Sequence, residues 1–179
     1  MSFFSENKKQ SLTVYEKKLL SFYCLGFFCE SSKAIIYYIV FHFLGFQKEY
    51  VIALLLMATL RISGGGLHFK NYFSCLLVSF IFLSLAILGG LILYIPLPVM
   101  IFLCMMCLIT AYKLVPIQAP TRPGASEQLI NSAKSHTAVK IILITVFICL
   151  FHNNIYGNIG FWTLIIHVVQ LTIAKKWRK

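Results

Sequence analysis

Long runs of apolar residues constrain this chain more than any other feature. Runs at 72–95, 97–115, 139–151 and 159–174 approach the length of about 17–25 residues with which an α-helix crosses the hydrocarbon core of a bilayer. Hydrophobic residues make up 59% of the chain, too many for a soluble domain. The sequence therefore predicts an all-α, polytopic membrane protein with about four full spans, in a single integral membrane domain over residues 1–179.

The first third of the chain is apolar in shorter pieces. Segments 34–46 and 50–60 have 13 and 11 residues, too few to cross a bilayer at about 1.5 Å per residue. They predict a short helical hairpin packed within the bundle, which brings the number of segments to as many as six. Segment 12–28 starts with a polar cluster and then turns apolar, as an N-terminal interfacial helix does.

The basic residues indicate which ends of these segments face the cytoplasm. Sixteen lysines and arginines oppose five glutamates, and they gather at both termini, around the 61–70 connection and around the 116–138 connection. The turns near 96–98 and 152–158 carry no charge. Because cytoplasmic loops of membrane proteins are rich in lysine and arginine, both termini and both basic connections are expected in the cytoplasm. Nucleic-acid binding has no support, since no recognition motif is present.

The six cysteines lie in or next to apolar segments, where a free thiol packs as a small hydrophobe. A disulfide framework is not expected, and Cys104 and Cys107 are interpreted as core residues although they form a C-x-x-C string. The 116–138 segment is predicted to be one long polar loop, of the kind that can hold a substrate. The sequence calls for no cofactor and no metal.

Chemistry concentrates between residues 61 and 75, which read Arg-Ile-Ser-Gly-Gly-Gly-Leu-His-Phe-Lys-Asn-Tyr-Phe-Ser-Cys. In one straight helix His68 and Cys75 would be about 10.5 Å apart, too far for a hydrogen bond. The glycine triplet resists helix and lets the chain turn. We therefore expect a helix break that brings His68 back to Cys75, with Cys75 about one turn inside the next helix.

This geometry would give a His68–Cys75 catalytic dyad, with Asn71 and backbone amides as donors to an oxyanion. Glycines also allow a ligand to approach the backbone closely, as at Gly65 and Gly66. Against this stands the structural interpretation, since a histidine and a cysteine at a membrane boundary usually only pack. No acidic residue nearby completes a triad.

The pattern Arg61-x-x-Gly-Gly-Gly-x-His68-x6-Cys75 resembles the accessory gene regulator protein B family of Gram-positive bacteria, small membrane endopeptidases of quorum sensing. The resemblance extends to size, basic ends and span order, although the 116–138 segment departs from the lysine-proline element expected there. It implies that His68 activates Cys75, which cleaves a short membrane-associated pro-peptide and carries it as a thioester until the peptide cyclises. Arg61, Gly65, Gly66, Lys70 and Asn71 would bind that substrate.

Two other classes remain open from the residues alone. A small transporter or exporter without covalent chemistry would show polar residues in several spans and repeat symmetry. A non-catalytic membrane scaffold would tolerate substitution of His68 and Cys75. The expected partners are the pro-peptide and the lipid bilayer, and a homodimer is left open.

Overall fold

The computed structural model describes residues 14–67, 69, 71–117 and 127–177. These residues form six α-helices and no named strand, and five of the helices are long and apolar enough to cross a membrane. The helices are α1 (Val14–Phe43), α2 (Gln47–Gly64), α3 (Tyr72–Ile92), α4 (Leu97–Leu114), α5 (Glu127–Leu150) and α6 (Ile155–Lys176). The prediction of a polytopic helical membrane protein is confirmed.

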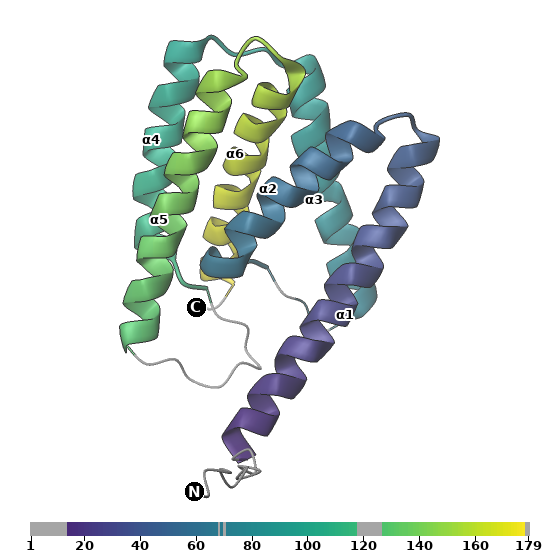
Figure 1. Ribbon diagram of the computed structural model, residues 1–179, viewed down its shortest axis with the longest axis vertical. Helices are drawn as coiled ribbons and strands as arrows, with labels where there is room; N and C mark the ends of the chain where they lie inside the picture. Colours follow the sequence, from purple (N-terminus) through teal and green to yellow (C-terminus); the bar gives the residue numbers. More distant parts are fainter. Residues whose placement is uncertain (1–13, 68, 70, 118–126, 178–179) are drawn as a thin grey trace, which may run out of the picture.

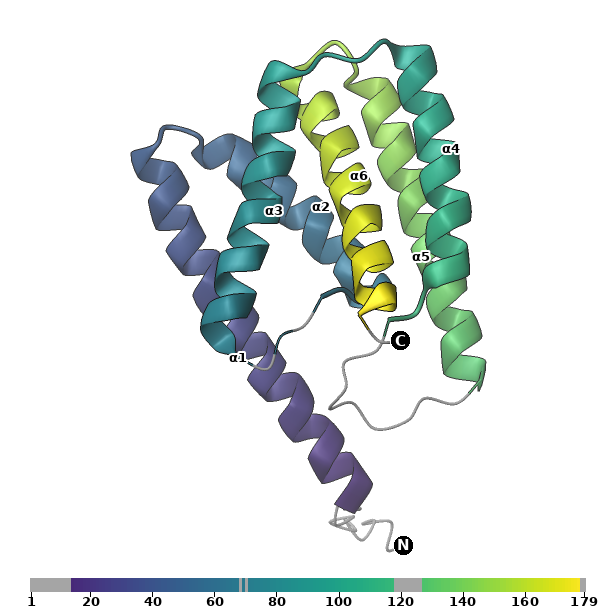
Figure 2. The same ribbon diagram turned by 180° about the vertical axis from the view of Figure 1, so that it is seen from behind.

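Helix α6 is the centre of the bundle. It packs against α2, α3, α4 and α5, whereas α1 contacts only α2 and α3 among the helices with substantial contacts. Figures 1 and 2 show α2 crossing α6 at a slant and α1 leaning out from the bundle at its first residues. As a result, 67% of the apolar window of α6 is buried but only 17% of that of α1.

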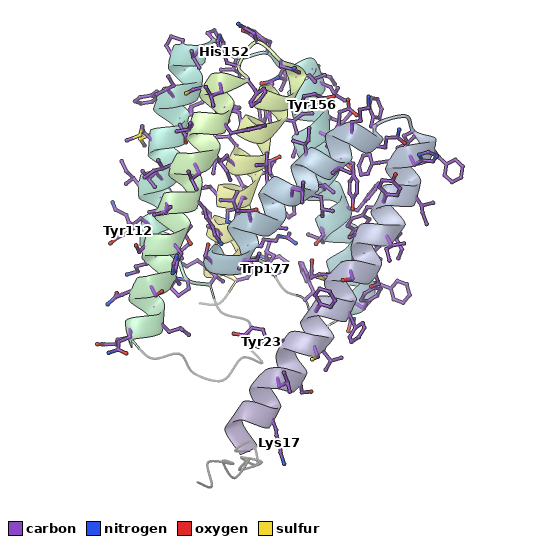
Figure 3. The ribbon with its side chains drawn as sticks, in the orientation of Figure 1. Lys17, Tyr23, Tyr112, His152, Tyr156 and Trp177 are labelled. Atoms are coloured by element: carbon purple, nitrogen blue, oxygen red, sulfur yellow. The ribbon has the colours of Figure 1, made fainter. Side chains whose placement is uncertain are left out.

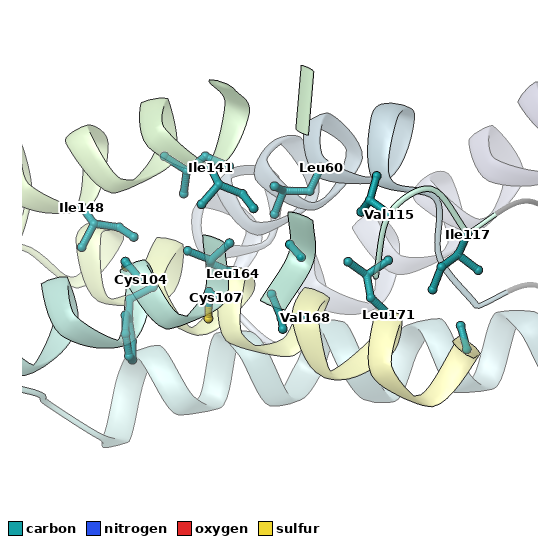
Figure 4. Close-up of a cluster of buried hydrophobic side chains, with 14 of the residues drawn as sticks. Leu60, Cys104, Cys107, Val115, Ile117, Ile141, Ile148, Leu164, Val168 and Leu171 are labelled. Carbon is teal, nitrogen blue, oxygen red and sulfur yellow. The ribbon is translucent and has the colours of Figure 1, made fainter. Parts of the chain in front are cut away.

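Large apolar side chains cover the outside of the bundle, as expected for helices in lipid. A second apolar set fills the space between α2, α4, α5 and α6 (Figure 4). Cys104 and Cys107 lie in this inner cluster with free thiols, which confirms that the C-x-x-C string is part of the core.

The seam between α3 and α6 is closed by close backbone approach. A Cβ on Gly90 would lie 2.4 Å from Ile159 Cγ1 and 2.8 Å from Ile159 Cα, so only glycine fits there. Beside it, Asn158 Nδ2 donates to the carbonyl oxygens of Gly90 and Leu93 at 2.7 and 2.8 Å. This end of α3 is therefore fixed to α6 by both packing and hydrogen bonds.

The predicted hairpin of segments 34–46 and 50–60 is present, with longer arms than the hydropathy suggested. The described part of segment 12–28 is not a separate interfacial helix but continues into the one helix α1, and the turn at Leu44–Phe46 leads into α2. Glu30 and Lys33 interrupt the apolar run in the sequence, but they pair with each other on one helix face. Helix α1 thus supplies a fifth candidate span, Tyr23–Phe43.

The prediction of a polar loop over 116–138 is wrong in its second half. Helix α5 begins at Glu127, so 127–138 is helical and extends the predicted 139–151 span. The error arises because hydropathy detects only the apolar part of a helix, whereas glutamate, glutamine, alanine and lysine continue it beyond the lipid. Residues 118–126, with Arg122, lie outside the described residues.

The two ends of the bundle differ in charge. The start of α1, the end of α2, the start of α3, the end of α4, the start of α5 and the end of α6 all lie at one end (Figures 1 and 2). Lysines at this end include Lys17, Lys113, Lys175 and Lys176. Figure 3 shows Trp177 there and Tyr156 near the opposite end, as aromatic anchors at two interfaces would be.

Candidate functional site

The glycine triplet ends α2 as the sequence predicts. Gly64 is the last helical residue, and Gly65 follows with a φ of +79°, a left-handed conformation that suits glycine. The chain there runs beside the segment after α4: the Ile117 N–H donates to the Gly64 carbonyl at 3.1 Å, and Gly65 bridges to Ile117. A Cβ on Gly65 would stand 2.1 Å from the Ile117 oxygen, so this crossing requires glycine.

Cys75 lies in the first turn of α3. Its N–H donates to the Asn71 carbonyl at 3.1 Å, the first hydrogen bond of the helix, and Asn71 is the N-cap residue without a capping side-chain bond. The thiol is therefore at the positive end of the α3 dipole. The residue is only 7% exposed. The predicted placement of Cys75, one turn inside a new helix, is confirmed.

A buried lysine of α1, Lys33, lies beside Cys75. Lys33 Nζ donates to Cys75 Sγ at 3.4 Å, and Lys33 is only 3% exposed. The same ammonium group forms an ion pair with Glu30, three residues earlier on α1. The thiol sulfur thus has an ammonium group as a direct neighbour.

Two tyrosines fix α1 against the first turns of α3. The hydroxyls of Ser32 and Tyr72 are 2.7 Å apart, and Tyr37 Oη donates to the Leu76 carbonyl at 2.6 Å. These contacts lie on either side of the Lys33–Cys75 pair along the seam. The position of Lys33 relative to the sulfur is consequently set by several bonds between the helices.

Arg61, near the end of α2, joins this group to α6. Its Nη2 donates to Gln170 Oε1 at 2.9 Å, and its Nη1 lies 3.8 Å from Glu30 Oε2. Glu30 therefore stands between two cations, Lys33 and Arg61. Three helices other than α3 contribute to the polar cluster, which we define as Glu30, Lys33, Arg61 and Gln170.

The polar cluster lines a small cavity of about 40 Å³ between α1, α2, α3 and α6. Tyr37 and Ser79 also face it, together with apolar side chains. Because a cavity needs about 10–15 Å³ of such volume to hold one water molecule, this cavity has room for a few water molecules.

The structure places some of the predicted site residues and leaves two outside. Arg61, Gly65, Gly66, Asn71 and Cys75 are described and belong to one stretch at the lower end of the bundle in Figure 1. His68 and Lys70 lie outside the described residues. Their described neighbours Leu67 and Phe69 belong to the non-helical connection between α2 and α3. The predicted helix break is confirmed, whereas the dyad itself stays a prediction.

Sequence reasoning gave no functional weight to Glu30, Lys33 and Gln170. It did not predict the proximity of Lys33 to Cys75, which lies 42 positions further along the chain. A usable signal was available, because a lysine inside an apolar span is costly unless it has a partner. Among the described residues, no three His, Cys, Asp or Glu side chains gather as metal ligands would.

Comparison with known proteins gives one result. The model of the family described as accessory gene regulator B matches residues 2–171, which is nearly the whole chain. No curated protein and no solved structure matches.

Proposed function

The chain belongs to the accessory gene regulator B family, and on that premise we propose that it is a cysteine endopeptidase which matures a short pro-peptide through a thioester. Membership links the chain to quorum sensing and to peptide processing at the membrane. The observation that carries the finer proposal is the environment of Cys75, a thiol at a helix N-terminus beside an ammonium group. Both features favour the thiolate, which is the nucleophilic form of cysteine.

The first half of the reaction transfers the peptide to sulfur. His68 takes the proton of Cys75, and the thiolate attacks a backbone carbonyl of the pro-peptide. The first-turn amides of α3 have no intrahelical acceptor and, with the Asn71 side chain, would donate to the resulting oxyanion. The carbon–nitrogen bond then breaks, and His68 returns its proton to the departing amine.

The second half releases the peptide as a ring. An internal cysteine or serine of the bound peptide gives its proton to His68 and attacks the thioester, so that a new thiolactone or lactone forms and Cys75 leaves as a thiolate. The attacking group and the thioester belong to one molecule, and this proximity favours cyclisation over hydrolysis.

Substrate binding is proposed for the 61–71 stretch. Gly65 packs on Ile117 and Gly66 is buried, so a peptide would contact these glycines only after this crossing opened. Arg61 and Lys70 would hold acidic residues of the precursor's tail. Arg61 is already bonded to Gln170 and lies 3.8 Å from Glu30. Binding a substrate carboxylate would therefore require Arg61 to exchange its Glu30 contact for the substrate.

We place this site on the cytoplasmic side of the cell membrane. The end of the bundle that carries it also carries Lys17, Lys113, Lys175 and Lys176. The α3–α4 and α5–α6 connections at the opposite end carry no lysine or arginine. This distribution follows the excess of basic residues in cytoplasmic loops.

The test is cleavage of the pro-peptide in membranes that hold the intact chain. The pro-peptide is to be sought as a short reading frame beside the gene, and its presence would favour the enzyme. We expect Cys75→Ser, Cys75→Ala and His68→Ala to lose cleavage, because each removes the nucleophile or its base. Cys149→Ser, a matched thiol at the far end of α5, is expected to cleave as the native chain does. Undiminished cleavage by a Cys75 variant would exclude the proposal and favour a transporter or scaffold.

A further inference from the structure

Lys33 is an unusual residue for its position. It stands near the middle of the candidate span Tyr23–Phe43 and is 3% exposed, so its ammonium group is shielded from water. A buried cation is tolerated only when anions or good acceptors surround it. The partners of Lys33 therefore indicate why the residue is there.

The charges around Lys33 do not balance when Cys75 is a neutral thiol. Within the polar cluster, the carboxylate of Glu30 faces two cations, Lys33 and Arg61. On the adjoining helices, the hydroxyls of Tyr37 and Tyr72 are bonded to Leu76 and Ser32. The fully buried His167 of α6, whose ring nitrogens have no hydrogen-bond partner among the described residues, is counted as uncharged. One positive charge is in excess among these described groups, and a thiolate on Cys75 would cancel it.

The nearest partners of Lys33 indicate a role at the nucleophile. The cavity that Lys33 lines measures about 40 Å³, which is room for a few water molecules. The sulfur of Cys75 is already within hydrogen-bond reach at 3.4 Å. The ammonium group is thus placed for the nucleophile.

We propose that Lys33 is a third catalytic residue, whose ammonium group holds the Cys75 sulfur as a thiolate before acylation and again when the thioester breaks. This inference rests on the proposed function. The thioester sulfur is neutral, so acylation restores the excess positive charge, and breaking the carbon–sulfur bond removes it. Lys33 keeps its proton throughout and favours sulfur as the leaving group in ring closure.

The test measures the reactivity of Cys75 in the full-length protein in detergent, without any substrate. Iodoacetamide alkylates thiolates, and mass spectrometry of the peptide that contains Cys75 gives its rate between pH 6 and pH 10. We expect Lys33→Met to lower this rate at pH 7 by about tenfold or more, and to approach the native rate at pH 10. Lys33→Arg, which keeps the charge, should retain most of the rate at pH 7.

The pH dependence separates charge from access to the buried thiol. A change in packing alters the alkylation rate equally at every pH, whereas loss of the cation lowers it only where the thiol is protonated. Lys113→Met removes a lysine from α4, away from Cys75, and should leave the profile unchanged. Because Lys33→Met removes one of the two cations beside Glu30, the double variant Glu30→Gln/Lys33→Met provides a second folded test with the same expected loss.

If the alkylation rate of Cys75 depended on pH as in the native chain in either Lys33→Met variant, the proposal would be overturned. Cleavage assays on the same proteins keep this outcome apart from failure of the proposed function. If Cys75 is required for cleavage but the Lys33→Met variants alkylate and cleave as the native chain does, only the role of Lys33 is excluded. If Cys75→Ser still cleaves, the endopeptidase proposal itself fails.

Discussion

The two ends of helix α3 are held in different ways. At its C-terminal end, Gly90 meets the backbone of Ile159, and Asn158 bonds two carbonyls of α3. At its N-terminal end, α3 meets α1 through Lys33, Ser32 and Tyr37, which form polar side-chain contacts. The first end is a packed seam with the most buried helix, and the second is a polar seam with one of the least buried.

This difference separates stability from chemistry along one helix. Close packing allows little change in volume, so substitutions at the α6 end should act on folding. The polar contacts at the α1 end surround the proposed nucleophile, so substitutions there should act on reactivity while costing less stability. Four variants test that separation, in order of decreasing effect on the free energy of unfolding.

Gly90→Ala should have the largest effect. The added Cβ would press on both the side chain and the backbone of Ile159, and overpacking of this kind costs about 3 kcal/mol. The measurement is the thermal unfolding of the protein in detergent. Gly26→Ala is the control, because nothing lies within 4 Å of a Cβ there and alanine favours the α1 helix. Equal stability of the two variants would contradict the packed seam.

Gly65→Ala should have the second largest effect and lower the free energy of unfolding by about 2 kcal/mol. Alanine is strained at the positive φ of this position, and its Cβ would press on the Ile117 oxygen. Cleavage per folded molecule should also fall, since the connection to α3 must shift. Gly45→Ala, at a φ of +81° but in open space between α1 and α2, is the matched control. It shares the backbone strain, and its cleavage per folded molecule should remain native. Native stability and native cleavage in Gly65→Ala would contradict the requirement for glycine where the chain crosses Ile117.

Asn158→Ala should cost about 1–2 kcal/mol, because it removes the donor to the Gly90 and Leu93 carbonyls. Unfolding in detergent reports this loss. The change is remote from Cys75, so the cleavage rate of the folded fraction should not alter. A fall in that rate larger than the fall in folded protein would show that the two ends of α3 are coupled.

Tyr37→Phe should have the smallest effect on folding, about 1 kcal/mol, since it removes one hydrogen bond to the Leu76 carbonyl and leaves the ring in place. The same variant loosens the register of α1 on α3 and should slow Cys75 alkylation several-fold. Ile39→Val, an exposed change on the same helix, is the control. Native alkylation in Tyr37→Phe would mean that this contact does not position Lys33.

The sequence could predict those parts of the fold that depend on interactions between residues close together along the chain. Helices α3, α4 and α6 were predictable because each is a continuous apolar run with its own backbone bonds. Helix α1 was not, because Glu30 and Lys33 divide its apolar run. The partners that make those charges tolerable, Arg61 and Cys75, belong to other helices.

The candidate site likewise has features that the local sequence encodes and features that depend on packing between helices. The helix break and the placement of Cys75 follow from local glycine chemistry and were predicted. The crossing of Gly65 with Ile117 depends on where the segment after α4 lies, and the bond from Arg61 to Gln170 depends on how α2 packs against α6. No local pattern encodes such contacts, which explains why the polar cluster emerged only from the fold.

The most direct test of the central claim is to trap the peptide on the enzyme. A pro-peptide whose internal cysteine or serine is replaced by alanine cannot cyclise, so the thioester should accumulate. Mass spectrometry of the intact chain should then show an adduct of the N-terminal part of the pro-peptide on Cys75, released by hydroxylamine and absent from Cys75→Ser. Cleavage of this pro-peptide with no adduct on Cys75, or with the adduct on another residue, would contradict the account.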